Sequence, residues 1–211
     1  EMGCGSGVTC WRRLRDWTRA GVWPAIHLKL LHLLGAAGRI DAERVVVDSA
    51  SVRAVLGGAY RTEPTDRAKK GCKRHLLTDA LGLPLVVQIG PANQRDDQRL
   101  PALLDAFPKL QGPRGRPRCK PRVLQGDAGY GFDHTIRELL ARGIRPLVKL
   151  RGDDTTGSGL GRTRYVVEQA LSWFNNCRRL RLCYERTGEH FQAFHDLAAT
   201  LICARRLWGT R

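Results

Sequence analysis

The chain has 211 residues, of which 42% are hydrophobic, so it can bury one ample core and does not have the composition of a disordered protein. No apolar run is long enough to span a bilayer, and the first residues lack the features of a signal peptide, which predicts a cytoplasmic protein with no membrane partner. The net charge of +16 favours a polyanionic partner, because each neutralised phosphate releases counterions. The seven cysteines form no C-x-x-C pair, so they predict neither a zinc site nor a disulfide framework.

The first forty residues are predicted to be helical. Trp11, Leu14 and Trp17 are the apolar positions of a basic helix, and residues 25–34 form a second, strongly apolar helix. Glycines at the end of that run stop it. We expect residues 1–40 to be a truncated helical segment, the remnant of an N-terminal domain, and residues 41–211 to be the main domain.

The rest of the chain alternates between strand and helix patterns. Val45-Val46-Val47 is a β-branched run typical of a strand buried on both faces, and it is expected to end at Asp48. The further strands expected are residues 74–78, 84–89, 122–124 and 145–150, the helices 98–107 (capped by Asp97), 135–142, 163–184 and 191–207, and the loops 57–71, 111–121 (basic, with Pro and Gly) and 152–161. Mixed strands with helices between them predict an α/β layer structure.

Two aspartates stand where predicted strands end. Asp48 follows the first buried strand, and Asp127 follows a later one, just before a glycine turn. Carboxylates at the carboxyl ends of neighbouring strands face the crevice where α/β proteins bind ligands. Two anions held close repel each other unless a cation lies between them, and Mg²⁺ suits such oxygen ligands. Taken singly, each aspartate is as well explained as a turn residue.

Glu168 lies on the long predicted helix. Apolar residues at helical spacing define the buried stripe of this helix, while Arg164, Glu168 and Asn175 recur on a neighbouring polar stripe. Arg164, one turn earlier, is placed to orient Glu168. Taken alone, Glu168 is more typical of a solvated helix residue. Further arginines follow on the same predicted helix and are well placed for phosphates.

Several segments together resemble the transposases of the insertion sequence five family. They are Val46-Val47-Asp48-Ser49, Lys73-Arg74-His75-Leu76-Leu77-Thr78-Asp79-Ala80-Leu81-Gly82-Leu83-Pro84, Asp127-Ala128-Gly129-Tyr130, and Arg164-Tyr165-Val166-Val167-Glu168 with Trp173 and Arg178-Arg179-Leu180-Arg181. Residues 3–17 also resemble the family's segment ahead of the catalytic domain. Ala128, Gly131 and Gln169 depart from the pattern, because the family usually has Arg, Asp and Arg at these positions.

The resemblance implies a ribonuclease H-like fold, a mixed sheet flanked by helices, with Asp48, Asp127 and Glu168 as catalytic residues that bind metal. It implies two Mg²⁺ ions per site, with Mn²⁺ as a substitute: one ion would activate the attacking water or 3′-hydroxyl and the other would stabilise the leaving 3′-oxygen. Strand cleavage at element ends and 3′-hydroxyl transfer into target DNA would follow. Residues expected to contact DNA are Lys73, His75, Arg164, Arg178, Arg179 and Arg181.

The implied partner is double-stranded DNA, with a possible homodimer on it and a nucleoid-associated place in a bacterial cytoplasm. Residues 1–40 would then be what remains of a DNA-binding domain. Two alternatives stay open. One is a catalytically inactive, DNA-binding transposase remnant, and the other is a metal-dependent nuclease on the same fold. A glycosidase with a carboxylate pair is disfavoured, because the charge of +16 has no role there.

Overall fold

The computed structural model describes residues 3–56, 64–65, 69–150 and 161–209. Its helices are α1 (Gly7–Arg19), α2 (Val22–Ala36), α3 (Asp96–Asp105), α4 (Asp133–Ala141), α5 (Gly161–Asn176) and α6 (Gly188–Trp208), with short 3-10 turns η2 (Ala128–Tyr130) and η3 (Arg178–Leu180). Its strands are β1 (Arg44–Ala54), β2 (Pro64–Thr65), β3 (Lys69–Thr78), β4 (Pro84–Pro91), β5 (Val123–Gly126), β6 (Arg145–Val148) and β7 (Leu182–Cys183). Large parts of the loops expected at 57–71 and 152–161 lie outside the described residues.

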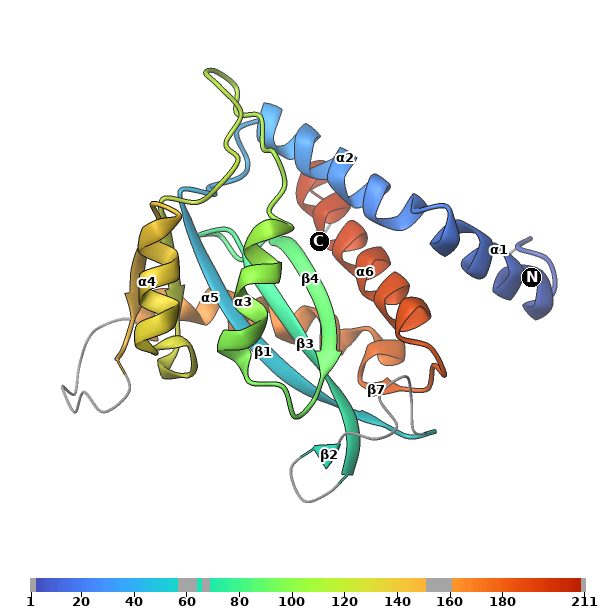
Figure 1. Ribbon diagram of the computed structural model, residues 1–211. Coiled ribbons are helices and arrows are strands. Elements are labelled where there is room, and N and C mark those ends of the chain that lie inside the picture. The colour runs from blue at the N-terminus through green and yellow to red at the C-terminus, as the bar shows by residue number, and fades with distance from the viewer. Residues whose placement is uncertain (1–2, 57–63, 66–68, 151–160, 210–211) are drawn as a thin grey trace.

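The main strands form one mixed sheet in the spatial order β4-β3-β1-β5-β6. β1, β3 and β4 pair antiparallel, and β1, β5 and β6 pair parallel. In Figure 1, α3 and α4 lie in front of this sheet and α5 lies behind it, while α2 and α6 run side by side at one end. An α/β fold with a mixed sheet flanked by helices, as expected for a ribonuclease H-like protein, is therefore confirmed.

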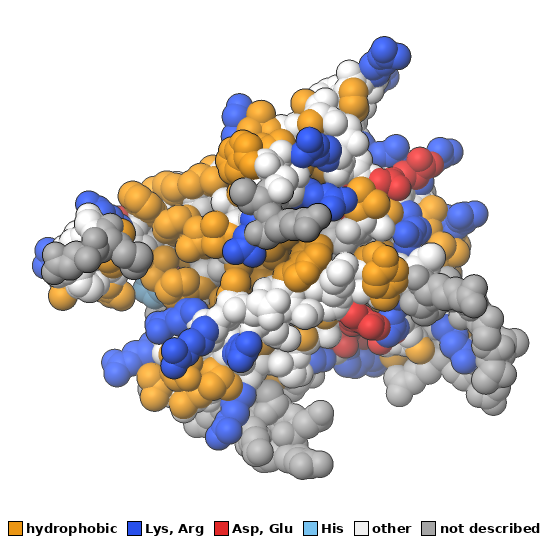
Figure 2. All heavy atoms as spheres, turned by 180° about the vertical axis from the view of Figure 1, so that it is seen from behind, with side chains coloured by type: hydrophobic (Ala, Val, Ile, Leu, Met, Phe, Trp, Pro, Cys, Tyr) orange, Lys and Arg blue, Asp and Glu red, His pale blue; other side chains and the backbone are white. Residues whose placement is uncertain are grey.

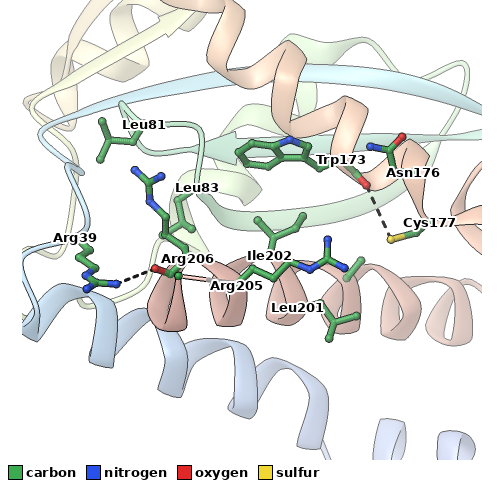
Figure 3. Close-up of a pocket in the computed structure, with 12 residues that line it drawn as sticks. Arg39, Leu81, Leu83, Trp173, Asn176, Cys177, Leu201, Ile202, Arg205 and Arg206 are labelled. Atoms are coloured by element: carbon green, nitrogen blue, oxygen red, sulfur yellow. Dashed lines mark hydrogen bonds between the residues drawn. The ribbon is translucent and has the colours of Figure 1, made fainter. Parts of the chain in front are cut away.

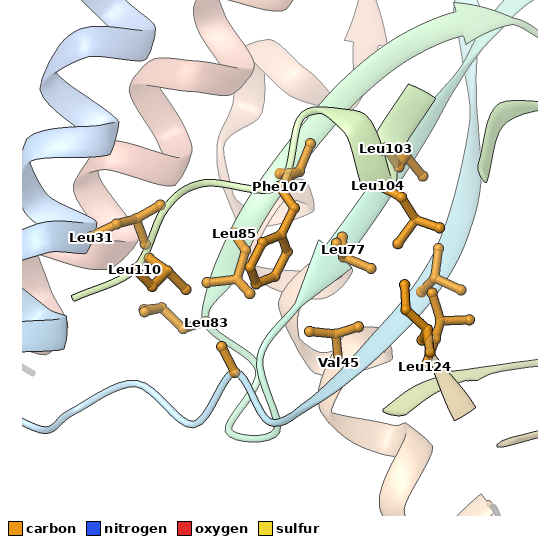
Figure 4. Close-up of a cluster of buried hydrophobic side chains, with 14 of the residues drawn as sticks. Leu31, Val45, Leu77, Leu83, Leu85, Leu103, Leu104, Phe107, Leu110 and Leu124 are labelled. Carbon is orange, nitrogen blue, oxygen red and sulfur yellow. The ribbon is translucent and has the colours of Figure 1, made fainter. Parts of the chain in front are cut away.

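Alternation along the strands divides the core in two. Val45 and Val47 of β1 pack with α2 and α3 in one cluster, which Figure 4 shows between the strands and Leu31, Leu103 and Phe107. Val46, between them, faces the opposite way and joins the cluster built on α5 and α6. Because successive side chains of a strand point to opposite faces, each position of β1 is assigned to one of these two layers.

α2 packs into the first of these cores. Its buried leucines, Leu30, Leu31 and Leu34, share a cluster with strand residues of the sheet. α1 instead exposes Val8, Trp11 and Trp17. The expected helices in residues 1–40 are confirmed, and their second half is continuous with the core of the main domain.

A buried arginine ties β3 to the helical layer behind it. The Arg74 guanidinium is fully buried and donates hydrogen bonds to Nε2 of His195 (2.7 Å), Oδ1 of Asn175 (3.1 Å) and the Leu180 carbonyl (2.8 Å). It also lies 5.2 Å from the centre of the Phe174 ring. Because one cation contacts α5, η3 and α6 together, it fixes the positions of these elements relative to the sheet.

Several predicted boundaries are wrong, and β3 begins at Lys69, inside the loop expected at 57–71. β1 does not end at Asp48 but continues to Ala54, because β3 pairs with it along nearly its whole length. The long predicted helix, residues 163–184, stops at Asn176 in the structure. Cys177 is extended there (ψ 103°), and Arg181 donates from Nε to the Asn175 carbonyl at 2.6 Å. The last carbonyls of a helix have no partner within the helix, so this charged donor supplies one of the missing hydrogen bonds at the end of α5.

In the described part of the chain, no helix is both long enough and apolar enough to cross a membrane.

Candidate active site

The sheet register brings Asp48 and Asp127 together. β1 and β5 pair in parallel, with Val45 opposite Leu124 and Val46 opposite Gln125. Asp48 and Asp127 each lie two residues past this last pair, close enough for the charge of Asp127 to act on Asp48. Asp48 shares a face of β1 with Val46, two residues earlier, and this is the face that α5 covers. The two aspartates expected to be neighbours therefore stand at one point of the sheet, beneath α5.

Two glycines allow the turn that holds Asp127. Asp127 caps η2, and its Oδ1 accepts from the backbone N–H of Gly129 at 2.9 Å. A Cβ on Gly129 would lie 2.8 Å from that same oxygen, and one on Gly126 would lie 3.0 Å from the Tyr130 ring. At the first distance the carboxylate would have to move, and at the second the ring would have to give by a few tenths of an ångström. The Gly-Asp-x-Gly-Tyr pattern thus reflects the space available around the carboxylate.

Helix α5 brings Glu168 and Arg164 over the aspartates. Thr163, at the start of the helix, accepts from Nε2 of Gln125 on β5 at 2.9 Å. One turn on, Nη2 of Arg164 donates to Oε1 of Glu168 at 3.1 Å, and its Nη1 lies 4.0 Å from Oδ2 of Asp127. Arg164 is therefore the cation shared by two of the three predicted carboxylates. Its expected role in orienting Glu168 is consistent with this geometry.

The carboxylates act on one another electrostatically. The pKa of Asp48 is raised to about 6, first by burial and then by the nearby charges of Asp127 and Glu168. A hydrogen bond from the backbone N–H of Ser49 (2.8 Å) and the charge of Arg164 oppose this rise. A raised carboxyl pKa among like charges is typical of sites that bind a cation or exchange protons.

A fourth carboxylate lies on the other face of β1, where sequence analysis expected only turn and cap residues. Asp96, at the start of α3, accepts from Oγ of Ser49 at 2.7 Å and from Nζ of Lys73 at 3.1 Å. Its charge and those of Asp48 and Asp127 raise the pKa of the Tyr130 hydroxyl, which burial raises most. The only sequence signal was the Asp-Asp pair at 96–97, which is also typical of a helix start. Asp97, expected as the cap, lies instead in the first turn, and Arg95 is the capping residue.

Two residues expected to touch DNA are engaged within the protein. His75 is fully buried, and burial lowers its pKa to about 4, so its ring is neutral and out of reach. A direct contact between His75 and DNA is therefore ruled out in this structure. Lys73 is mostly buried, with its ammonium group held by Asp96 and by the Gln94 carbonyl at 3.2 Å.

The arginine cluster expected on the long helix lies beyond its end. Arg178 is exposed on η3, and Arg181 follows it, bonded to the end of α5. Arg179 pairs with Glu185 at 2.6 Å and stacks on the Tyr184 ring. Of the three, only Arg178 has no side-chain partner in the described residues. The predicted row of helical arginines is therefore corrected to a short, bent segment.

The donor chemistry at Asp48, Asp127 and Glu168 fits a divalent ion. All are oxygen ligands, and mutual repulsion around Asp48 is what a cation would relieve. Within the described ranges, no three His, Cys, Asp or Glu side chains converge closely enough to hold a metal. Glu168 is bound to Arg164 instead. The two aspartates are thus the primary ligand candidates, and Glu168 would have to exchange Arg164 for the ion.

A large cavity lies apart from the three carboxylates. About 890 Å³ in volume, it is formed by α5, α6 and the β3–β4 turn, with Trp173, Leu81 and Ile202 among its lining residues (Figure 3). None of the three carboxylates lines it. Seen from behind, Lys and Arg side chains are spread widely over the surface, and Asp and Glu show in only a few places (Figure 2).

Comparison with known proteins places the chain in a family. A family model described as "Transposase DDE domain" matches residues 40–203. The putative transposase for insertion sequence element IS402 of Burkholderia cepacia is 43% identical over 147 residues, 70% of this chain and 67% of that protein. An uncharacterized 16.2 kDa protein of the same element is 66% identical over 58 residues, 28% of this chain and 40% of that protein.

More distant similarities were also found. The putative transposase for IS6501 of Brucella ovis is 26% identical over 139 residues, 63% of this chain and 98% of that protein. Among solved structures, the catalytic domain of Mos1 mariner transposase matches with a TM-score of 0.33 and 10% identity, over 89% of this chain and 91% of that one. On the family match and the IS402 relative, the chain belongs to the transposase DDE domain family and is an insertion-sequence DDE transposase.

Proposed function

We propose that this chain cleaves DNA at the ends of an insertion sequence of the insertion sequence five family and joins the freed 3′-hydroxyl to target DNA. Asp48, Asp127 and Glu168 are the proposed catalytic carboxylates. The single observation that carries the proposal is the parallel β1–β5 pairing, which ends two residues before both Asp48 and Asp127, on the face of β1 covered by the helix that bears Glu168. Among solved relatives in fold, one Mos1 transposase complex is described as containing Mn.

The proposed metal site holds two Mg²⁺ ions, with Mn²⁺ as a substitute, which when bound supply Lewis-acid chemistry for phosphoryl transfer. The protein itself contributes position and charge. Buried Asp48 and turn-bound Asp127 present oxygens at fixed points of a rigid sheet. Arg164, shared between Asp127 and Glu168, can turn to a phosphate oxygen once Glu168 binds an ion. Fixed groups of this kind stabilise charge without rearrangement during the reaction.

The proposed DNA partner is supported by the charge of +16 and by exposed arginines such as Arg178 on η3. A homodimer on DNA remains part of the proposal. It would allow two element ends to be processed together.

The test is a nicking assay on a supercoiled plasmid that carries the DNA flanking this coding sequence, with Mn²⁺ or Mg²⁺. Wild-type protein should nick it only with a divalent ion. Asp48→Asn, Asp127→Asn and Glu168→Gln should each lose at least about a hundredfold in rate while keeping the fold, because one ligand charge is gone. Arg186→Gln, an exposed position outside the proposed site, is the matched control, and it should retain cleavage. Unchanged cleavage by Asp48→Asn would remove that residue from the site.

A specific observation favours one alternative, a non-catalytic protein that binds DNA. Arg164 already neutralises Glu168 and lies near Asp127, as a structural ion pair would. Such a protein would bind the plasmid and never nick it. A nuclease would nick the plasmid but fail to join a labelled 3′-hydroxyl end to it. The nicking and strand-transfer assays together therefore separate a transposase, a nuclease and a non-catalytic DNA-binding protein.

A further inference from the structure

A basic loop joins α3 to β5 and projects from the molecule. The loop, residues 110–122, rises at the upper edge of Figure 1 near the end of α2. Leu110 and Arg118 close its base with two backbone hydrogen bonds of 2.9 and 2.7 Å. Nε2 of Gln111 donates to the carbonyls of Gly112 and Gly115, at 3.1 and 3.0 Å. These bonds give the loop a defined shape, so its side chains are held rather than carried on a loose tail.

Positive charge is concentrated on this loop. Basic side chains occupy every second position from 114 to 122: Arg114, Arg116, Arg118, Lys120 and Arg122. All five line a hollow of about 440 Å³ between the loop, the end of α2 and Gly143 after α4, and no Asp or Glu lines it. In the view from behind, the projecting tip at the top carries Lys or Arg (Figure 2).

Three of these cations have no internal partner. Lys120 donates to the Arg142 carbonyl at 2.6 Å, and Arg122 pairs with Glu43 at 2.8 Å. Over the described ranges, the side chains of Arg114, Arg116 and Arg118 make no hydrogen bond or ion pair. Several guanidinium groups held around one hollow without counter-charge repel one another, and an anion would relieve that repulsion.

We propose that the basic loop binds the phosphate backbone of duplex DNA, as a second contact apart from the carboxylate site. This inference rests on the proposed function for its choice of polyanion. Arginine forks match phosphate oxygens bidentately, and no large apolar side chain of the loop is exposed to anchor a protein partner. β5 separates Arg122 from Asp127, and its four residues span about 13 Å. DNA held on the loop therefore lies beyond the cleavage point.

The first experiment compares two triple variants of the whole chain. Arg114→Gln/Arg116→Gln/Arg118→Gln removes the unpaired loop charges. The control, Arg53→Gln/Arg137→Gln/Arg186→Gln, removes the same charge from exposed positions elsewhere in the chain. Binding of a short fluorescent duplex of arbitrary sequence is measured by anisotropy across a salt series, with melting curves confirming that both variants fold.

The loop variant should bind roughly tenfold more weakly or worse at about 0.1 M salt, and the slope of log K against log salt should fall by up to about 2.7, or about 0.9 for each lost phosphate contact. The control should change little. Equal losses in both variants, or no loss in the loop variant, would overturn the proposal. If wild type binds no duplex at all, the proposed function fails with it. If Asp48→Asn loses nicking and keeps wild-type binding, the proposed function stands, and a failure of the loop variant to lose affinity then contradicts the loop proposal alone.

Cys119 offers an independent readout. This exposed, free thiol lies in the loop and lines the same hollow, whereas exposed Cys10 lies on α1. Alkylation by a maleimide, followed residue by residue with mass spectrometry, should slow at Cys119 when duplex DNA is added and stay unchanged at Cys10. Equal rates at Cys119 with and without DNA, under conditions where anisotropy shows binding, would contradict the proposal. Protection by single-stranded RNA at equal concentration and not by duplex DNA would overturn the choice of partner.

Discussion

Asp48→Asn should stabilise the protein at neutral pH while abolishing cleavage. In the folded protein the pKa of Asp48 is raised from 3.8 to about 6, chiefly by burial and also by the charges of Asp127 and Glu168. The folded state therefore binds this proton more tightly than the unfolded chain does. Stability is lost as pH rises from about 4 to about 6, and the full penalty remains above that range. At 1.36 kcal/mol for each pH unit, ionised Asp48 costs about 3 kcal/mol as an upper figure.

Asparagine keeps the shape of the side chain and can still accept from the Ser49 N–H, but it carries no charge. Urea denaturation at pH 8 without divalent ions should therefore show a higher free energy of unfolding for the variant, by up to about 3 kcal/mol. At pH 4 the difference should nearly vanish. Mg²⁺ should stabilise wild type at pH 8 and the variant much less, because the ion relieves the same repulsion. If the variant is less stable than wild type at pH 8, burial and like charge at Asp48 do not destabilise the folded protein, and the reasoning is refuted.

Three further substitutions, the first paired with a surface control, test the core and the surroundings of the site. Arg74→Met should lower the free energy of unfolding by about 3 kcal/mol in urea, because buried partners lose their donor, whereas Arg178→Met on the surface should change it by less than about 0.5 kcal/mol; similar values for the two would contradict the role of the buried cation. Gly129→Ala should cut nicking at least about tenfold, because its Cβ would lie 2.8 Å from the Asp127 carboxylate, and normal nicking would show that this turn is not needed. Tyr130→Phe removes a buried hydroxyl without a hydrogen-bond partner, so thermal unfolding should give equal or higher stability, by up to about 1 kcal/mol; a clear loss would reveal a partner for that hydroxyl.

Local patterns in the sequence were sufficient for most of the elements and their order, although not for β2 or for β7, which lies inside the helix predicted at 163–184. The Val45-Val46-Val47 run, the hairpin before Pro84 and the helical stripe around Glu168 each follow from short-range periodicity, which depends on neighbours within a few residues. The strand-end position of Asp127 followed from the same reasoning, whereas its nearness to Asp48 depends on the parallel pairing of β1 with β5. Resemblance to transposases supplied the fold and the membership among insertion-sequence DDE transposases, and both are confirmed, while the insertion sequence five family stays a prediction.

Only the tertiary structure decided what each of these residues contacts. Pairing with β3 extends β1 past Asp48 to Ala54, and no local signal in residues 49–54 specifies a partner so distant in the chain. Alternation on β3 points His75 into the interior and Arg74 into the opposite core, although both read as surface residues next to Lys73. The hollow beside the basic loop is formed with residues at the ends of α2 and α4, which are distant in sequence and adjacent only in the folded structure. Sequence fixes periodicity because backbone geometry is local, whereas burial and charge pairing depend on which distant segments pack together.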